Sequence, residues 1–105
     1  MNMDEISKNV ALAKSLNPDE RKTKFELLFS FHSEADSKNY YSEIYHPEHL
    51  STMVSYERAG EFIVGFRFGT AIDVKNLSTY TDCFCGIAKE CNGKLFSWKL
   101  RVKID

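Results

Sequence analysis

Alternating apolar and polar residues predict four β-strands, and apolar residues at three- and four-residue spacing predict three α-helices. The clearest strand runs from Thr23 to Phe31, where Phe25, Leu27, Phe29 and Phe31 alternate with other residues. Further strands are predicted for residues 50–57, 61–70 and 96–104. Helices are predicted for residues 4–16, for residues 34–45, and for a segment that begins after Asp73 or Asn76 and ends near Cys91. The elements therefore follow the order helix, strand, helix, strand, strand, helix, strand.

Two strand-helix-strand halves around a hairpin indicate an α+β fold, a ferredoxin-like βαββαβ sandwich. The hairpin is predicted at Arg58-Ala59-Gly60, a short connection that contains glycine. The predicted sheet is antiparallel with strand order 4-1-3-2. A chain of 105 residues fits a single domain. In it, an extra N-terminal helix (residues 1–18) precedes the ferredoxin-like core (residues 23–104).

The phases of the strands assign side chains to two faces of the predicted sheet. One face carries Phe25, Phe66 and Trp98 and is expected to pack beneath two helices, with Phe96 and Ile104 in the same phase. The opposite face is mixed in charge with a small apolar centre. Either the N-terminal helix or a partner is expected to cover it, although an antiparallel sheet can also leave such a face to water. We predict that a partner binds there through Glu26, Leu28, Ile63, Arg67, Lys99 and Arg101.

Charge argues against direct binding of nucleic acid. Fourteen Lys and Arg residues balance 15 Asp and Glu residues, so the net charge is −1, without the basic excess of proteins that grip phosphate backbones. RNA-recognition modules of this fold stack bases on exposed aromatic rings. Here the strand phase offers Ile63, Gly65 and Arg67 on the open face, with the phenylalanines turned inward. An RNA-binding module is therefore only an alternative.

No arrangement of residues indicates catalysis or a metal site. His46 and His49 flank Pro47, which disrupts the helix that a two-histidine metal site would need. His32 follows a strand beside Ser33, where a surface position is expected. We therefore predict a protein that is not an enzyme and has no cofactor. A small enzyme or ligand-sensing domain that uses one of these histidines as a base is the alternative from a different class.

Cysteine usage and hydropathy indicate a cytoplasmic protein. The three cysteines, Cys83, Cys85 and Cys91, are odd in number and close together, which does not suit a disulfide framework. No apolar run is long enough to span a bilayer, and residues 1–5 do not resemble a signal peptide. We expect no membrane association. An open sheet face or edge also predicts that the chain forms a homodimer.

Several segments resemble the family of ribonuclease E inhibitors known as regulator of ribonuclease activity B. The similar segments are Leu16-Asn17-Pro18-Asp19 with the strand Phe25–Phe31, then His32-Ser33-Glu34-Ala35-Asp36, and finally Ile87-Ala88-Lys89-Glu90 with Gly93 and Trp98. The resemblance covers nearly the whole chain. A departure is Leu95-Phe96-Ser97-Trp98, which keeps only the tryptophan of the family's Tyr-Asp-Gly-Trp stretch.

The resemblance implies a non-catalytic regulator that binds the non-catalytic scaffold region of ribonuclease E and modulates RNA decay. Fold alone does not establish this function, because many unrelated functions share one fold. A toxin-neutralising immunity protein is a further alternative, since such proteins can also be small and non-catalytic.

Overall fold

The computed structural model describes residues 2–45 and 52–104 and consists of an antiparallel sheet with helices. The elements are α1 (Met3–Leu16), the 3-10 helix η1 (Glu20–Lys22), β1 (Thr23–Phe31), α2 (Glu34–Ile44), β2 (Thr52–Arg58), β3 (Glu61–Phe68), α3 (Val74–Glu90) and β4 (Gly93–Val102). This confirms the α+β class and the predicted order of helices and strands. Residues 50 and 51 of the second predicted strand lie outside the described residues.

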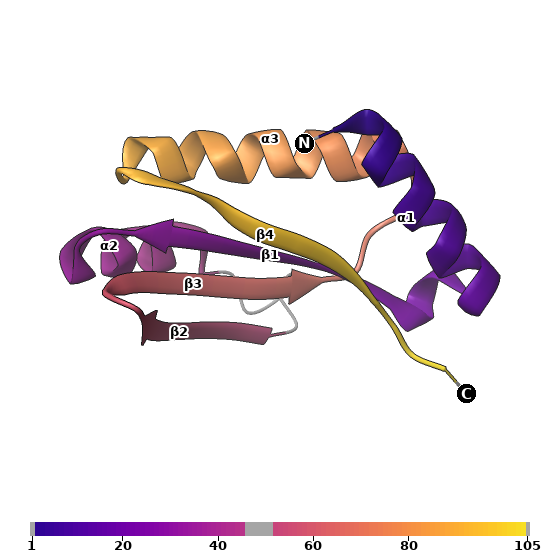
Figure 1. Cartoon of the computed structure of the whole chain (residues 1–105), viewed down its shortest axis with the longest axis horizontal. Coiled ribbons are helices and arrows are strands. Elements are labelled where there is room, and N and C mark those ends of the chain that lie inside the picture. The colour runs from indigo at the N-terminus through magenta and orange to yellow at the C-terminus, as the bar shows by residue number, and fades with distance from the viewer. Residues whose placement is uncertain (1, 46–51, 105) are drawn as a thin grey trace.

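The four strands pair in the order β2-β3-β1-β4, and each pair is antiparallel (Figure 1). Read from the β4 edge, this order is 4-1-3-2. Phe25 of β1 lies opposite Phe68 of β3 on one side and Leu100 of β4 on the other. This arrangement is compatible with a ferredoxin-like sandwich.

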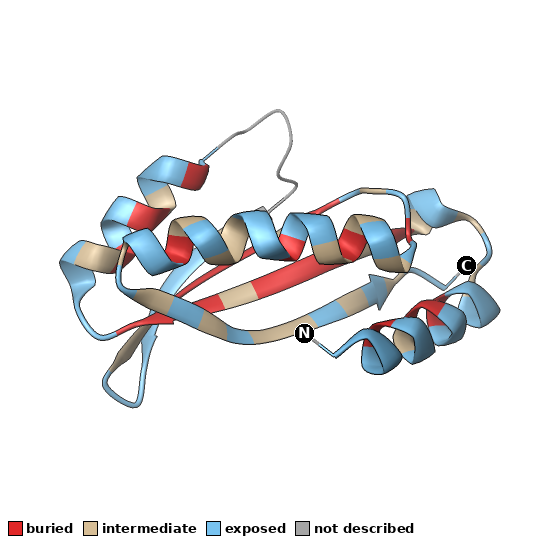
Figure 2. Cartoon of the chain, turned by 90° about the horizontal axis from the view of Figure 1, so that it is seen from above, coloured by how far each residue is buried: buried red, intermediate tan, exposed pale blue. Residues whose placement is uncertain are grey.

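The core lies between one face of the sheet and the helices α2 and α3 (Figure 2). Its centre consists of fully buried rings from β1 and β3, including Phe25, Phe29 and Phe66. Tyr40 of α2 packs against Phe29 and the Tyr40 hydroxyl donates a hydrogen bond of 3.2 Å to the carbonyl oxygen of Phe84 in α3. Burying each such side chain contributes about 1.5–3 kcal/mol, so the alternating β1 pattern stabilises this fold strongly.

The N-terminal helix joins this same core. Ile6 and Val10 of α1 are buried with the sheet and α3, and the Asn2 side chain accepts the Asp4 backbone N–H at the start of the helix. At the other end of α1, the Asn17 side-chain amide donates to the Lys103 carbonyl oxygen at 2.9 Å. Because α1 packs on the core side of the sheet, it does not cover the opposite face, contrary to one of the predictions.

A β-bulge in β4 overturns the predicted position of Phe96. Leu28 pairs with Ser97, but the next residue of β1, Phe29, pairs with Leu95, so Phe96 is an extra residue between them. The insertion turns the Phe96 ring away from the core and leaves it 44% exposed. The prediction that Ile104 faces the core is also wrong, because β4 ends at Val102 and Ile104 is 68% exposed.

The hairpin between β2 and β3 lies at the predicted connection, except that Arg58 belongs to β2 and pairs with Glu61. Ala59 and Gly60 both have positive φ, 51° and 80°, as a two-residue turn that matches the twist of the strands requires. At the end of α3, Asn92 also has a positive φ, 61°. Gly93 begins β4 opposite Phe31.

Candidate functional site: the open face of the sheet

All six predicted partner-binding residues come from strands and lie on the face of the sheet that the helices leave uncovered, here called the open face. The register places Glu26 of β1 between Arg67 of β3 and Lys99 of β4, and it pairs Lys24 with Arg101. Leu28 and Ile63 lie further along the same face. The structure thus brings these residues together from three strands.

Three cations surround one carboxylate at the centre of this face, and we call this group the basic cluster. Glu26 Oε1 accepts hydrogen bonds from Arg67 Nε at 2.8 Å and Arg101 Nε at 2.9 Å, and Lys99 Nζ lies 3.5 Å from Oε2. The Glu26 side chain is 8% exposed, whereas those of Arg67, Lys99 and Arg101 are 38–49% exposed. Glu26 therefore holds the cations in place but cannot itself offer much surface to a partner.

The neighbouring cations lower the pKa of Glu26. Burial by itself raises the pKa of a carboxyl, but the hydrogen bonds from Arg67 and Arg101 and the charge of Lys99 outweigh it. The pKa of Glu26 therefore lies below its ordinary value of 4.5. The group stays ionised at neutral pH, and the cluster keeps two more positive charges than negative ones.

This pKa predicts how stability depends on pH. A carboxyl whose pKa is lower in the folded state stabilises the fold above its unfolded pKa and loses that contribution as pH falls through the folded pKa. We expect the stability difference between wild type and Glu26→Gln to be full at pH 7 and to shrink below about pH 5. Urea unfolding from pH 7 to pH 3 measures it. The pKa values of Asp19 and Glu34 are also lowered, but both residues are present in wild type and variant, so their contributions cancel in the stability difference. A constant difference over this range would contradict the prediction.

Beside the basic cluster lies an apolar patch that spans all four strands. It consists of Leu28, Val54, Tyr56, Ile63 and Phe96. Val54, Tyr56 and Phe96 are 44%, 41% and 44% exposed, whereas Ile63 is 1% exposed. Ile63 therefore supports the patch from beneath and cannot contact a partner directly, which corrects its predicted role.

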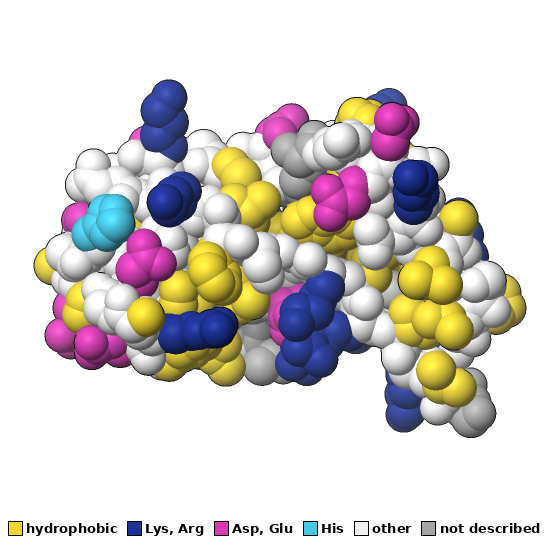
Figure 3. All heavy atoms as spheres, viewed as in Figure 1, with side chains coloured by type: hydrophobic (Ala, Val, Ile, Leu, Met, Phe, Trp, Pro, Cys, Tyr) yellow, Lys and Arg dark blue, Asp and Glu magenta, His cyan; other side chains and the backbone are white. Residues whose placement is uncertain are grey.

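An arginine lies across this patch. The Arg58 guanidinium, from the end of β2, is 6.0 Å from the centre of the Phe96 ring in β4, at the outer limit of a cation–π contact. Between these two strands lie Ser30 and Ile63, which are 2% and 1% exposed. Figure 3 shows hydrophobic side chains gathered around a Lys or Arg side chain, next to further cations that partly cover an acidic side chain. The open face is thus apolar at one end and basic at the other.

The register reveals a charge asymmetry that the net charge conceals. The side chains that share the phase of the open face include six cationic and two acidic ones: Lys24, Arg58, Arg67, Lys94, Lys99 and Arg101 against Glu26 and Glu61. The chain as a whole carries a net charge of −1. The open face therefore attracts acidic groups, although the composition is balanced.

The partner-binding residues predicted from the sequence did not include five that shape this surface: Lys24, Val54, Tyr56, Arg58 and Phe96. The alternation in residues 23–31 and 97–102 already assigns Lys24 to the same face as Arg101, so that part of the signal was present. Nothing in the local pattern around Phe96 marks the bulge. The open face therefore does carry exposed aromatic rings, contrary to the prediction.

The candidate nucleophiles and bases are not arranged for catalysis in the described part of the chain. Burial raises the pKa of the Cys85 and Cys91 thiols, which disfavours the reactive thiolate. His32 Nδ1 is 3.9 Å from Glu61 Oε1, too far for a hydrogen bond, and its side chain is 81% exposed. His46 and His49 lie outside the described residues.

Within residues 2–45 and 52–104, no three His, Cys, Asp or Glu side chains are placed to hold a metal ion. No helix in these ranges has both the length and the hydropathy needed to cross a bilayer. Comparison of the chain with models of protein families and with curated protein sequences gives no match.

Proposed function

We propose that the protein is a non-catalytic regulator that binds an acidic segment of a protein partner on the open face. The observation that carries the proposal is the continuity of the apolar patch with the basic cluster on a face that α1, α2 and α3 leave uncovered. Apolar anchors beside complementary charge are what a polypeptide interface requires. The resemblance to the ribonuclease E inhibitors supports an endonuclease of that type as the partner, and regulation of RNA decay in the cytoplasm as the outcome.

The centre of the open face favours a polypeptide over RNA. RNA-recognition modules of ferredoxin-like fold stack bases on rings of the sheet surface. Here the two central strands present Glu26, Leu28 and Ser30 from β1 and Ile63, Gly65 and Arg67 from β3, none of them aromatic. Only the edge strands present rings, Tyr56 and Phe96. The side chains of Leu28 and Val54 occupy the space above Gly65, because a Cβ there would overlap Leu28 Cδ2 and lie 3.2 Å from Val54 Cγ2. This aliphatic centre suits apolar side chains of a peptide.

The direct test is binding of the purified chain to the isolated scaffold region of a ribonuclease E-type endonuclease. We expect Phe96→Ala to weaken this binding about tenfold, because exposed aromatic anchors at interfaces commonly cost 1–2 kcal/mol or more when truncated. Fluorescence anisotropy measures the affinity, and light scattering of the free chain establishes its oligomeric state. Leu12→Ala is the matched control, since Leu12 is an apolar residue 58% exposed on α1, away from the open face.

The outcomes separate the alternatives. Binding that Phe96→Ala weakens and Leu12→Ala leaves unchanged supports the proposal. Absence of binding to the scaffold region, or equal binding by both variants, would refute the assignment. If a single-stranded RNA oligonucleotide binds instead and Phe96→Ala abolishes that binding, the RNA-binding alternative replaces it, because Phe96 and Tyr56 are the exposed rings of this face.

A further inference from the structure

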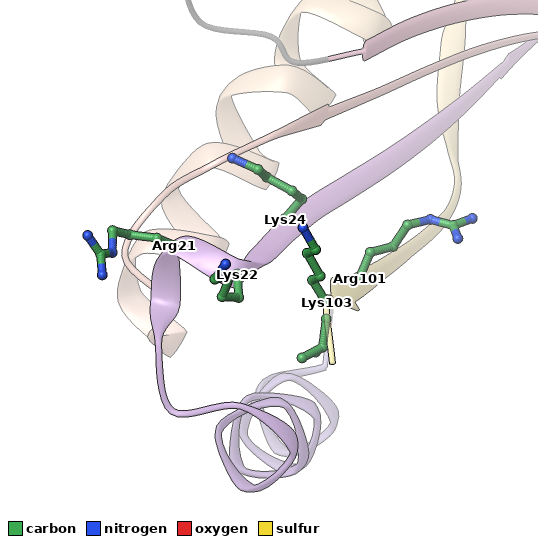
Figure 4. A pocket seen from close by; sticks show the side chains of 6 residues that line it. Arg21, Lys22, Lys24, Arg101 and Lys103 are labelled. Atoms are coloured by element: carbon green, nitrogen blue, oxygen red, sulfur yellow. The ribbon is translucent and has the colours of Figure 1, made fainter. Parts of the chain in front are cut away.

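The sheet ends in two edge strands, and the β4 edge is protected against pairing with another strand. β4 carries Lys94, Lys99 and Arg101 in exposed positions, and the exposed Lys103 follows it. The side chains of Arg101 and Lys103 extend in different directions at this end of the sheet (Figure 4). Charged side chains, above all lysine, and bulges are the usual devices that prevent edge-to-edge association. The β4 strand has both, because it also contains the bulge at residue 96.

The β2 edge lacks this protection. β2 pairs with β3 alone among the described strands, and Val54, Ser55, Tyr56 and Glu57 are all exposed. Neither face of the strand is therefore covered along these residues. Charge in residues 53–58 is confined to Glu57 and Arg58, at the end near the hairpin. An exposed edge strand with an uncharged middle is a template for another strand.

The hairpin determines which backbone groups of β2 point outward. Ala59-Gly60 forms a two-residue turn, and Arg58 and Glu61 pair directly beside it. In such a hairpin the pair that flanks the turn exchanges both backbone hydrogen bonds. Hydrogen-bonded and non-hydrogen-bonded pairs alternate along antiparallel strands, so every second residue of β2 directs its N–H and C=O groups away from β3. The outward-facing residues are Met53, Ser55 and Glu57.

We propose that β2 pairs antiparallel with β2 of a second copy of the chain, about a twofold axis at Ser55. In this register the outward groups of Ser55 meet those of Ser55 in the second copy, and those of Met53 meet those of Glu57. A register shifted toward the hairpin leaves Met53 unpaired, because β2 ends at Arg58. A register shifted the other way leaves Glu57 unpaired, because β2 begins at Thr52. Pairing about Ser55 therefore uses every outward group of residues 53–57.

The side chains are self-complementary in the same register, which is why the strand that fits this edge is a second copy. Val54 lies opposite Tyr56 of the second copy, and Tyr56 opposite its Val54, on the side of the open face. Aromatic and β-branched residues in such cross-strand pairs stabilise antiparallel sheets. Glu57 and its symmetry mate lie about 14 Å apart, at about 3.4 Å per residue, so like charges do not oppose each other. The apolar patches of the two copies become continuous, and the open face stays accessible.

The first test is sedimentation equilibrium of the purified chain at about 1–300 µM. We expect a monomer–dimer equilibrium with a Kd on the order of 10 µM. Ser55→Pro should weaken dimerisation at least about tenfold, because it removes the outward N–H at the axis from both copies. The β2–β3 ladder does not use that N–H, so circular dichroism should show an unchanged fold. Ser55→Ala is the matched control, keeps the N–H, and should stay within about threefold of wild type.

The second test is cross-linking, which reports the register. Ser55→Cys should form an intermolecular disulfide with oxidised glutathione as the oxidant, because the two Cα atoms would lie about 5.5 Å apart. Glu57→Cys is the matched control on the same face of the strand. Its two Cα atoms would lie about 14 Å apart, beyond the roughly 7 Å limit for a disulfide. Wild type, which retains Cys83, Cys85 and Cys91, gives the baseline under the same conditions.

The results decide between a second copy and other occupants of the edge. A wild-type chain that stays monomeric up to about 300 µM, or a Ser55→Pro variant that dimerises like wild type, would overturn the proposal. Cross-linking of Glu57→Cys equal to that of Ser55→Cys would overturn the register, and it decides the proposal by itself if Ser55→Pro does not fold. If the chain is monomeric and Ser55→Pro weakens binding of the ribonuclease E scaffold region, a strand of that partner occupies the edge and self-pairing is wrong. The proposal does not rest on the partner assigned to the open face.

Discussion

Gly93→Ala should lower the free energy of unfolding by about 3 kcal/mol, at the upper end of the range for overpacked cores. A Cβ on residue 93 would overlap the Phe31 ring, which is 1% exposed. The ring cannot simply rotate away, because its other side packs against Tyr40 with ring centres 5.1 Å apart. Residue 93 cannot retreat either, since it is paired with Phe31 in the β1–β4 ladder. Urea unfolding followed by circular dichroism measures the effect.

Gly86→Ala is the matched control, with an expected effect of opposite sign. Gly86 lies in the exposed middle of α3, and a Cβ there would meet nothing within 4 Å. Alanine in a helix is favoured over glycine by about 1 kcal/mol, so this variant should be more stable than wild type. If Gly93→Ala costs less than about 1 kcal/mol, or if both variants shift stability in the same direction, the account of Gly93 as a space for the Phe31 ring is wrong.

Much of the fold could be predicted because its strands alternate cleanly. In β1 the phenylalanines and leucine of the core face are separated by single residues of the open face, and β3 repeats the pattern. That periodicity assigns a face to every residue of both strands without knowledge of their partners. The same reasoning failed at Phe96, because a bulge changes the phase and depends on the register with β1, which is a non-local property.

The candidate site was predictable in its position but not in its character. The alternation of the strands placed Glu26 and Arg67 on one face. It did not indicate that three cations converge on Glu26 and bury it. Burial here depends on where long, flexible side chains end. The charge asymmetry of the open face was missed for a different reason, because it requires the pairing of strands such as that of Lys24 with Arg101, two residues from opposite ends of the core. Their charges are seen to lie together only when the register between β1 and β4 is known.

Glu26→Gln should lower the free energy of unfolding by about 2–3 kcal/mol at pH 7, since removing one member of a buried ion pair leaves the other charges uncompensated. The glutamine has nearly the same shape, so packing is preserved and the loss reports charge. Part of the loss should be recovered in high salt, which screens the repulsion among Arg67, Lys99 and Arg101. Glu43→Gln, an exposed residue of α2, should change stability by less than about 0.5 kcal/mol. A loss for Glu26→Gln no larger than this would contradict the prediction.

The same variant also tests whether Glu26 competes with an acidic partner for the cations of the basic cluster. If an acidic partner binds the basic cluster, Glu26 neutralises part of the charge that attracts it. Glu26→Gln should then bind the partner more tightly, by about two- to tenfold, although the variant is less stable. Stability and affinity would move in opposite directions, which damage to the fold alone does not produce. Anisotropy at a temperature well below the variant's unfolding transition measures the affinity, and weaker binding of Glu26→Gln would show that the partner does not use this charge.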